Sequence, residues 1–296
     1  MSYIYMYGMI LATRSFLLYD DYPVADGYAE IKEYNFGVGG ETSVASLILS
    51  SLGCNVVMAG ANTGTENDVV LRNYFGDKSV DMGLVKFNKD FSGVIDNVII
   101  DKHTRTCFGE FGRYFGSKSH WYEGPDEEAI AKCSVVGTDP FFGDDIIALC
   151  KKHGKKYATI DSRYDSEMVA HCELIAISHQ YLYDNYPGMS FDELYQLYTD
   201  HSEGLIIFTA GENPVMYGRK GQPPKFFSPY EVDVVSTLGA GDSFKAGTIY
   251  ALNAGMNDDE IVEFACAVAG CACAKYPIAK NPPTLEKVKE LIESRR

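Results

Sequence analysis

Short apolar segments alternate with helical patterns along most of this 296-residue sequence. Successive parallel strands need a crossover helix between them, so the alternation predicts a doubly wound, mostly parallel α/β sheet. Ligands of such sheets gather beyond the carboxyl ends of the strands. The expected strands are residues 55–59, 134–138, 157–161, 174–178 and 205–209, and helices are expected at residues 144–153 and 191–201.

Four other apolar stretches are expected to form strands with no crossover helix between the members of each pair. An apolar strand at residues 3–11 precedes them, and a polar turn at Lys102 and His103 separates the last two. We therefore expect one domain over residues 1–296, with a second, smaller sheet inserted at about 14–36 and 93–111. Its strands are expected at residues 14–20, 28–36, 93–101 and 106–111.

The stretch from residue 233 to residue 244 carries the clearest chemistry. An apolar extended segment leads into Gly239, Ala240 and Gly241, and a helix then begins with Asp242 in its first turn. Unpaired N–H groups at a helix N-terminus can hold phosphoryl oxygens, and a carboxylate beside them can take the proton of an alcohol. The pattern predicts a small-molecule kinase. The other role open to Asp242 is to stabilise the helix dipole, worth ~0.3–1 kcal/mol.

This motif resembles the C-terminal signature of the ribokinase-like, or PfkB, carbohydrate kinases, which reads Asp-Thr-x-Gly-Ala-Gly-Asp followed by a small residue and Phe. The sequence here is Ser236-Thr237-Leu238-Gly239-Ala240-Gly241-Asp242-Ser243-Phe244. A second family signature is a Gly-Gly pair, followed four residues later by Asn on a helix that ends in Leu-Gly. It matches Gly39-Gly40 and Leu52-Gly53, with Val44 at the Asn position. Thr42 is expected to cap this helix.

The resemblance implies a role for each matched residue. Asp242 is expected to be the catalytic base, and the amides of Gly239, Ala240 and Gly241 are expected to form the anion hole. The positions expected at the acceptor are Gly39, Gly40, Thr13, Asp139 and Asp242, and those expected along the nucleotide are Thr209, Gly211, Ser178 and Thr237. Asp139 and the turn at residues 209–211 are also open to a purely structural role at strand ends. The two insertions would form a β-sheet lid over the sugar site, which in this family often supplies a dimer contact.

Some positions depart from the family pattern. Ser236 replaces an aspartate that helps to organise a monovalent cation, so potassium activation is doubtful. Ser178 and Tyr181 replace the Asn and Glu that help to place magnesium, so the metal ligands are unknown. Thr13 replaces a sugar-binding aspartate. The changes at Thr13 and Val44 favour an unusual acceptor over ribose or fructose.

Composition excludes several classes of protein. A formal charge of −15 argues against nucleic acid as a partner, because phosphate backbones attract a surplus of Lys and Arg. No apolar run approaches the ~20 residues of a membrane span, and the start lacks the charged region of a signal peptide, so a cytoplasmic protein is expected. The eight cysteines show no paired Cys-x-x-Cys spacing, which favours reduced thiols.

The sequence therefore predicts an ATP-dependent, magnesium-using phosphotransferase that acts on a hydroxyl of a sugar or polyol and forms a homodimer through the lid. The alternative is a non-catalytic descendant that binds a sugar or nucleotide. Retention of Asp242 favours catalysis, because binding alone does not need a base. An NAD-dependent Rossmann enzyme is disfavoured, since residues 37–40 do not follow the Gly-x-Gly-x-x-Gly pattern.

Overall fold

The computed structural model describes residues 2–115 and 121–295. Within them, nine strands form one large sheet in the order β13-β12-β11-β10-β9-β8-β1-β4-β5. The pairs from β10–β11 to β4–β5 are parallel, whereas β12 and β13 join the β11 edge antiparallel. The strands are β1 (Ile4–Gly8), β4 (Val56–Gly60), β5 (Val80–Asp81), β8 (Val135–Thr138), β9 (Tyr157–Ile160), β10 (Leu174–Ser178), β11 (Leu205–Ala210), β12 (Asn213–Gly218) and β13 (Lys225–Phe227).

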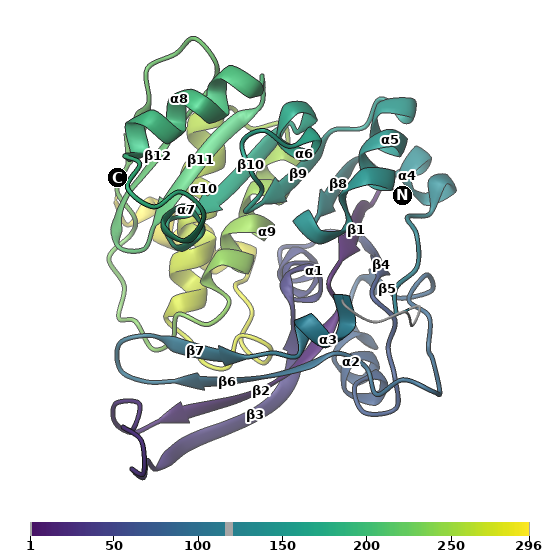
Figure 1. Cartoon of the computed structure of the whole chain (residues 1–296), viewed down its shortest axis with the longest axis vertical. Helices are drawn as coiled ribbons and strands as arrows, with labels where there is room; N and C mark the ends of the chain where they lie inside the picture. The colour runs from purple at the N-terminus through teal and green to yellow at the C-terminus, as the bar shows by residue number, and fades with distance from the viewer. Residues whose placement is uncertain (1, 116–120, 296) are drawn as a thin grey trace.

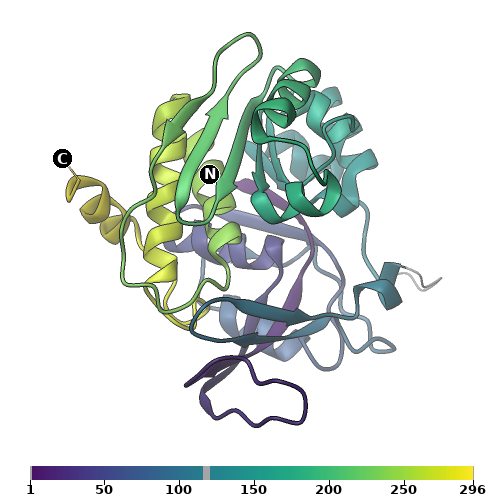
Figure 2. The same ribbon diagram turned by 60° about the vertical axis from the view of Figure 1, so that its left-hand side comes forward.

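Helices lie on both faces of this sheet, as a doubly wound fold requires (Figures 1 and 2). One group consists of α1 (Glu41–Ser51), α9 (Ala240–Asn253), α10 (Asp258–Cys273) and α11 (Leu285–Glu293). The other consists of α4 (Glu127–Lys132), α5 (Gly143–His153), α6 (Glu167–His171), α7 (His179–Asn185) and α8 (Phe191–His201). Shorter connections carry α2 (Asp68–Phe75), α3 (Phe111–Phe115) and the 3₁₀ helix η1 (Pro140–Phe142). The predicted α/β fold is thus confirmed.

A second sheet of four strands lies across the end of the large sheet and corresponds to the predicted insertions (Figure 1). Its order is β3-β2-β6-β7, with β2 and β6 parallel at the centre. These strands are β2 (Leu11–Leu18), β3 (Ile31–Gly39), β6 (Ile95–Ile100) and β7 (Arg105–Phe108). We call this sheet the lid.

Two local predictions were wrong. The single strand expected at residues 3–11 is two strands, because the chain leaves the large sheet after Gly8 and enters the lid at Leu11. Gly8 has a φ of 152°, and a Cβ there would lie 2.2 Å from Asp139 Oδ2. Thr42 does not cap α1: the N-cap is Gly40, and the Thr42 hydroxyl donates instead to Asp139.

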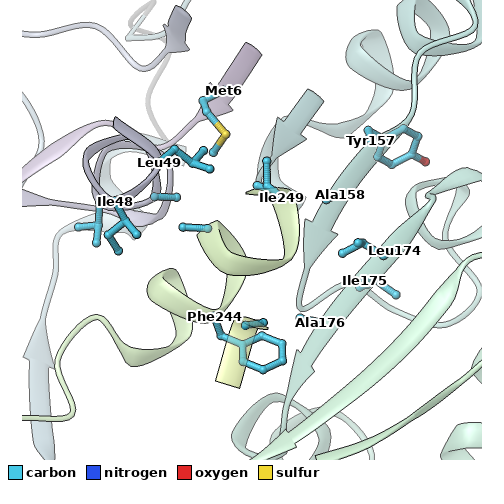
Figure 3. Packing of buried hydrophobic residues seen from close by; sticks show 14 of the residues in the cluster. Met6, Ile48, Leu49, Tyr157, Ala158, Leu174, Ile175, Ala176, Phe244 and Ile249 are labelled. Atoms are coloured by element: carbon cyan, nitrogen blue, oxygen red, sulfur yellow. The ribbon is translucent and has the colours of Figure 1, made fainter. Parts of the chain in front are cut away.

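The core around α9 explains why a polar site can be held rigidly. Figure 3 shows Phe244 and Ile249 of α9 between Ile48 of α1 and the strand residues Ala158 and Ala176. All five side chains are buried. Because close packing on several sides leaves little freedom, the first turn of α9 is fixed relative to the strand ends.

Among the described residues, no helix is both long and apolar enough to cross a membrane. All eight cysteines are free thiols, as the sequence predicted.

Candidate active site

A cleft of about 520 Å³ lies between the lid and the carboxyl ends of the large sheet. Its floor includes the ends of β9, β10 and β11, where ligands of parallel sheets bind. Its roof comes from the lid. The polar and charged lining residues are Thr13, Ser15, Asn35, Glu41, Asp96, Arg105, Asp161, Ser178, Thr209, Asp242 and Tyr276.

The first turn of α9 forms the middle of the cleft. Gly239 is the N-cap residue with a φ of 80°, and no side chain caps the helix. The N–H groups of Gly239, Gly241 and Asp242 have no hydrogen-bond partner within the described part of the chain, whereas Ala240 N donates to Thr237 O at 3.2 Å. Gly239 and Gly241 line the cleft, but Ala240 does not. Unpaired amides at a helix start attract anions.

Asp242 enters the cleft from the first turn of α9 and is partly exposed there. Burial raises its pKa to about 6, an effect that Lys245 opposes and Asp139 reinforces. A base with a pKa just below neutral pH is deprotonated at pH 7 yet still basic enough to take a proton. The carboxylate and the unpaired amides thus occupy the same part of the cleft.

Lys245 and Asp139 form a buried ion pair beneath this turn. Burial lowers the pKa of Lys245, but Asp139, Glu41 and Asp242 outweigh that effect and raise it. The other Asp139 oxygen accepts hydrogen bonds from Met9 N and from Thr42 Oγ1 at 2.9 Å. Asp139 is fully buried and is not among the lining residues of the cleft, so the structure places it behind the cleft wall.

The start of α1 also borders the cleft. Gly40 caps the helix with a φ of 81°, and Glu41 is the first helical residue. Burial raises the pKa of Glu41 well above its usual value, Asp139 adds to this effect, and Lys245 opposes it. Gly39 and Gly40 line the cleft as predicted. A Cβ at Gly39 would lie 1.7 Å from Thr13 Oγ1, so glycine is required by space.

The lid contributes a carboxylate that the sequence did not single out. Thr13 of β2 is paired in register with Asp96 of the neighbouring strand β6. Burial raises the pKa of Asp96 to about 6, and the neighbouring Thr13 side chain opposes this shift. Both line the cleft. An aspartate therefore stands beside Thr13, where the sequence itself offers only a hydroxyl.

The far end of the cleft holds two of the residues predicted along the nucleotide. Ser178 and Thr209 line it, at the ends of β10 and β11. Ser178 N and Oγ donate to the two carboxylate oxygens of Asp161 at 2.7 and 3.2 Å. Gly211 and Thr237 lie outside the lining, Thr237 at a smaller hollow beside the lid.

Ser236 occupies a buried turn just before the anion-binding amides. Its hydroxyl accepts a hydrogen bond from Leu238 N at 3.1 Å, and its own N–H donates to Cys273 O. The neighbouring loop at residues 275–281 also reaches the cleft. The hydroxyl of Tyr276 in this loop is hydrogen-bonded to the hydroxyl of Ser15 at 2.8 Å, and this bond connects the lid to the loop.

Sequence reasoning missed Glu41, Asp96, Arg105 and Lys245. Two of these carried a usable signal, since Glu41 directly follows the Gly-Gly pair and Lys245 interrupts an apolar helix face one turn after Asp242. Asp96 and Arg105 sit in ordinary strand patterns and carried none. Within the described residues, no group of three or more His, Cys, Asp or Glu side chains is arranged to hold a metal.

The structure is thus a doubly wound sheet whose lid covers a helix start with unpaired amides and a carboxylate, an arrangement suited to proteins that hold an anionic group. The chain belongs to the pfkB family carbohydrate kinases, since the model of that family matches residues 1–285.

Solved structures of ribokinases share the fold. A putative ribokinase from Agrobacterium tumefaciens superposes with a TM-score of 0.86 at 18% identity, covering 99% of this chain and 98% of that one. Arabidopsis thaliana ribokinase, solved with ribose and ATP, gives a TM-score of 0.80 at 16% identity and 99% coverage of both chains.

Sequence relatives match only in part. The 5-dehydro-2-deoxygluconokinase of Bacillus subtilis is 29% identical over 112 residues, which are 38% of this chain and 34% of that protein. The enzyme of the same name from Clostridium perfringens is 24% identical over 106 residues, 36% of this chain and 31% of that protein. The match thus spans about a third of each relative's length.

Proposed function

We propose that this chain is an ATP-dependent phosphotransferase that phosphorylates a hydroxyl of a sugar or sugar-like acceptor. The observation that carries the proposal is the position of Asp242, whose carboxylate shares the cleft with the unpaired amides of Gly239 and Gly241. A protein that only binds sugar or nucleotide needs the amides but not a base with a pKa of about 6. The alternative of a non-catalytic descendant is therefore less favoured.

The transfer step uses these groups as follows. The acceptor oxygen forms a bond to the γ-phosphorus of ATP, and its proton passes to the Asp242 carboxylate. The bond from the γ-phosphorus to the bridging oxygen breaks, and its electron pair leaves on ADP. The amides at the α9 start stabilise the negative charge on the transferring group, as preorganised donors do in other phosphoryl transfers.

Magnesium fits this cleft as an ion that comes with the nucleotide. Magnesium retains several waters and often takes only one or two protein carboxylates besides phosphates. Asp161 is the carboxylate beside Ser178 and Thr209, and Ser178 already donates to both of its oxygens. Asp161 would thus contact the water shell of the ion. A similar ribokinase fold, a putative ribokinase II from E. coli, was solved with ATP and Mg²⁺ (TM-score 0.77, 14% identity, 99% and 100% coverage).

The test is a screen of the full chain against sugars, polyols, nucleosides and sugar acids, with ADP formation as the readout. The acid 5-dehydro-2-deoxygluconate belongs in the set because the relatives are named for it. ADP formation that requires one acceptor, and that Asp242→Asn lowers by ~10²–10⁴-fold, supports the proposal. Tight nucleotide or sugar binding without ADP formation for any acceptor would instead support the non-catalytic alternative.

We further propose that the lid mediates a homodimer. Apolar side chains at its outer end are exposed, among them Tyr19, Val24, Tyr28, Ile31 and Tyr34. Exposed apolar groups in one region favour association. Sedimentation at micromolar concentration tests this, and a monomer mass would contradict it. A cytoplasmic location stays a prediction from the sequence.

A further inference from the structure

We call the part of the cleft that lies between the lid, the start of α1 and Asp242 its acceptor end. This part carries more negative than positive charge. Glu41, Asp96 and Asp242 line it, and Arg105 is the one cationic side chain among the described lining residues. Lys245 lies beneath the wall, but its ammonium is hydrogen-bonded to Asp139. These carboxylates influence one another: Asp96 raises the pKa of Asp242 behind the larger effect of burial, and Asp242 acts likewise on Glu41.

Two of these carboxylates have an oxygen that nothing in the described chain satisfies. Glu41 Oε2 and Asp96 Oδ1 are both buried and have no hydrogen-bond partner there. Buried polar atoms are rarely left in this way, and each exception calls for an explanation, such as a functional role or a bound ion or water. Both residues line the cleft, so a molecule bound there would lie against their side chains.

Three neutral polar residues, Thr13, Ser15 and Asn35, line the cleft nearby. Thr13 lies beside Asp96 and lowers its pKa, the hydroxyl of Ser15 is bonded to Tyr276 at 2.8 Å, and the side-chain oxygen of Asn35 accepts a hydrogen bond from the Tyr74 hydroxyl at 3.4 Å. Val44 adds an apolar side chain to the same wall. This end of the cleft thus offers mainly carboxylate acceptors, which an ammonium group with three donors and a positive charge satisfies better than a neutral hydroxyl.

We propose that the acceptor is an amine-bearing sugar or polyol, whose protonated amino group binds Glu41, while Asp96 adds to the attraction and a hydroxyl meets Asp242. This inference rests on the proposed function, because it names the acceptor of the same site. A sugar acid is disfavoured, since its carboxylate would meet three carboxylates and a single arginine. A protonated Glu41 that donates to a neutral acceptor is the competing explanation, and it gives no preference for an amine.

The test measures binding rather than turnover, so that it does not depend on catalysis. Calorimetry on the full chain with a non-hydrolysable ATP analogue uses two sets of matched probes: D-glucosamine, D-glucose and D-glucuronate, and 1-amino-1-deoxy-D-fructose with D-fructose. We expect the amine in at least one set to bind about tenfold or more tightly than its neutral partner, the gain of one charge-assisted hydrogen bond. The acid should bind most weakly.

Glu41→Gln should remove the preference for the amine while leaving affinity for the ATP analogue unchanged, which also shows that the variant folds. Asp96→Asn should reduce the preference. The matched control is Glu286→Gln, which makes the same change in the first turn of the exposed helix α11 and should have no effect. Equal binding of neutral and amine probes, tighter binding of the acid, no binding of either amine, or an unchanged preference in Glu41→Gln would each overturn the inference.

The two proposals fail in different ways. ADP formation that favours a neutral acceptor overturns the inference and leaves the phosphotransferase standing. An amine preference that depends on Glu41, without ADP formation for any acceptor, overturns the phosphotransferase and leaves the binding inference standing.

Discussion

The starts of α1 and α9 both border the cleft and are built alike. Each helix is capped by a glycine with φ near +80° and by no side chain, and each has an acid in its first turn, Glu41 or Asp242. The helices pack together, and both acids lie within electrostatic reach of Lys245. They differ in sequence, because α9 keeps the family signature whereas α1 has Val44 at the Asn position. Under the two proposals above, this shared geometry would serve phosphoryl transfer at the α9 start and acceptor choice at the α1 start.

Exchanging the two acids for amides tests this division of roles most strongly. Asp242→Asn removes the proton acceptor, so turnover should fall by ~10²–10⁴-fold with nucleotide affinity nearly unchanged. Glu41→Gln should keep turnover at saturating acceptor and raise KM for the preferred acceptor instead. Steady-state kinetics with each variant measures both. An equal loss of kcat in the two variants would mean that both acids take part in the chemical step.

Lys245 is the cation common to both helix starts, so its removal should destabilise both. Lys245→Met leaves the buried Asp139 without its partner, and breaking a buried ion pair from one side typically costs ~3–5 kcal/mol of unfolding free energy. Urea unfolding should show a clear fall in the midpoint. Lys132→Met is the control, since this lysine is exposed on α4 and pairs with Glu128 at the surface. Equal midpoints for the two variants would contradict the structural role of Lys245.

The pH dependence of kcat/KM tests Asp242 through the charged residues near it. Asp242 must be deprotonated to act, so kcat/KM should be present above a pKa of about 6 and fall by about tenfold per pH unit below it. Asp96→Asn should move the inflection to lower pH, and Arg105→Gln should move it to higher pH. Titration of the substrates is common to all variants, so these opposite shifts report on Asp242. Identical profiles would refute its assignment as the base.

The smallest expected effect is that of potassium. Ser236 supplies a neutral oxygen that already accepts from Leu238 N, and oxygen sites owe much of their cation affinity to ligand charge. Replacing choline chloride by potassium chloride at constant ionic strength should therefore change turnover by less than about twofold. A severalfold rise specific to potassium would show that carbonyls or Asp233 form a cation site beside the α9 start.

Local sequence patterns correctly predicted the strands and helices whose bounds are set by their own residues. The strand at 174–178 and the helix at 191–201 have the expected bounds, the helix because Ser190 and Glu193 form a capping box. The passage from β1 to β2 was missed because residues 4–13 are all buried, so no change in hydropathy marks the transfer between sheets. Asp96 was missed because it looks like any polar residue in a lid strand.

What the sequence alone determined is the parallel α/β fold, the lid and the stretch that carries Gly239, Gly241 and Asp242, because each depends on residues close together in the chain. Only the tertiary structure revealed that Asp139 is paired with Lys245, 106 residues away, and is therefore withdrawn from the cleft. It also brought Asp96 beside Thr13, and Glu41 into the same cleft as Asp242. Charge and burial act through space, so the chemical character of the acceptor end could not be read from neighbours along the chain.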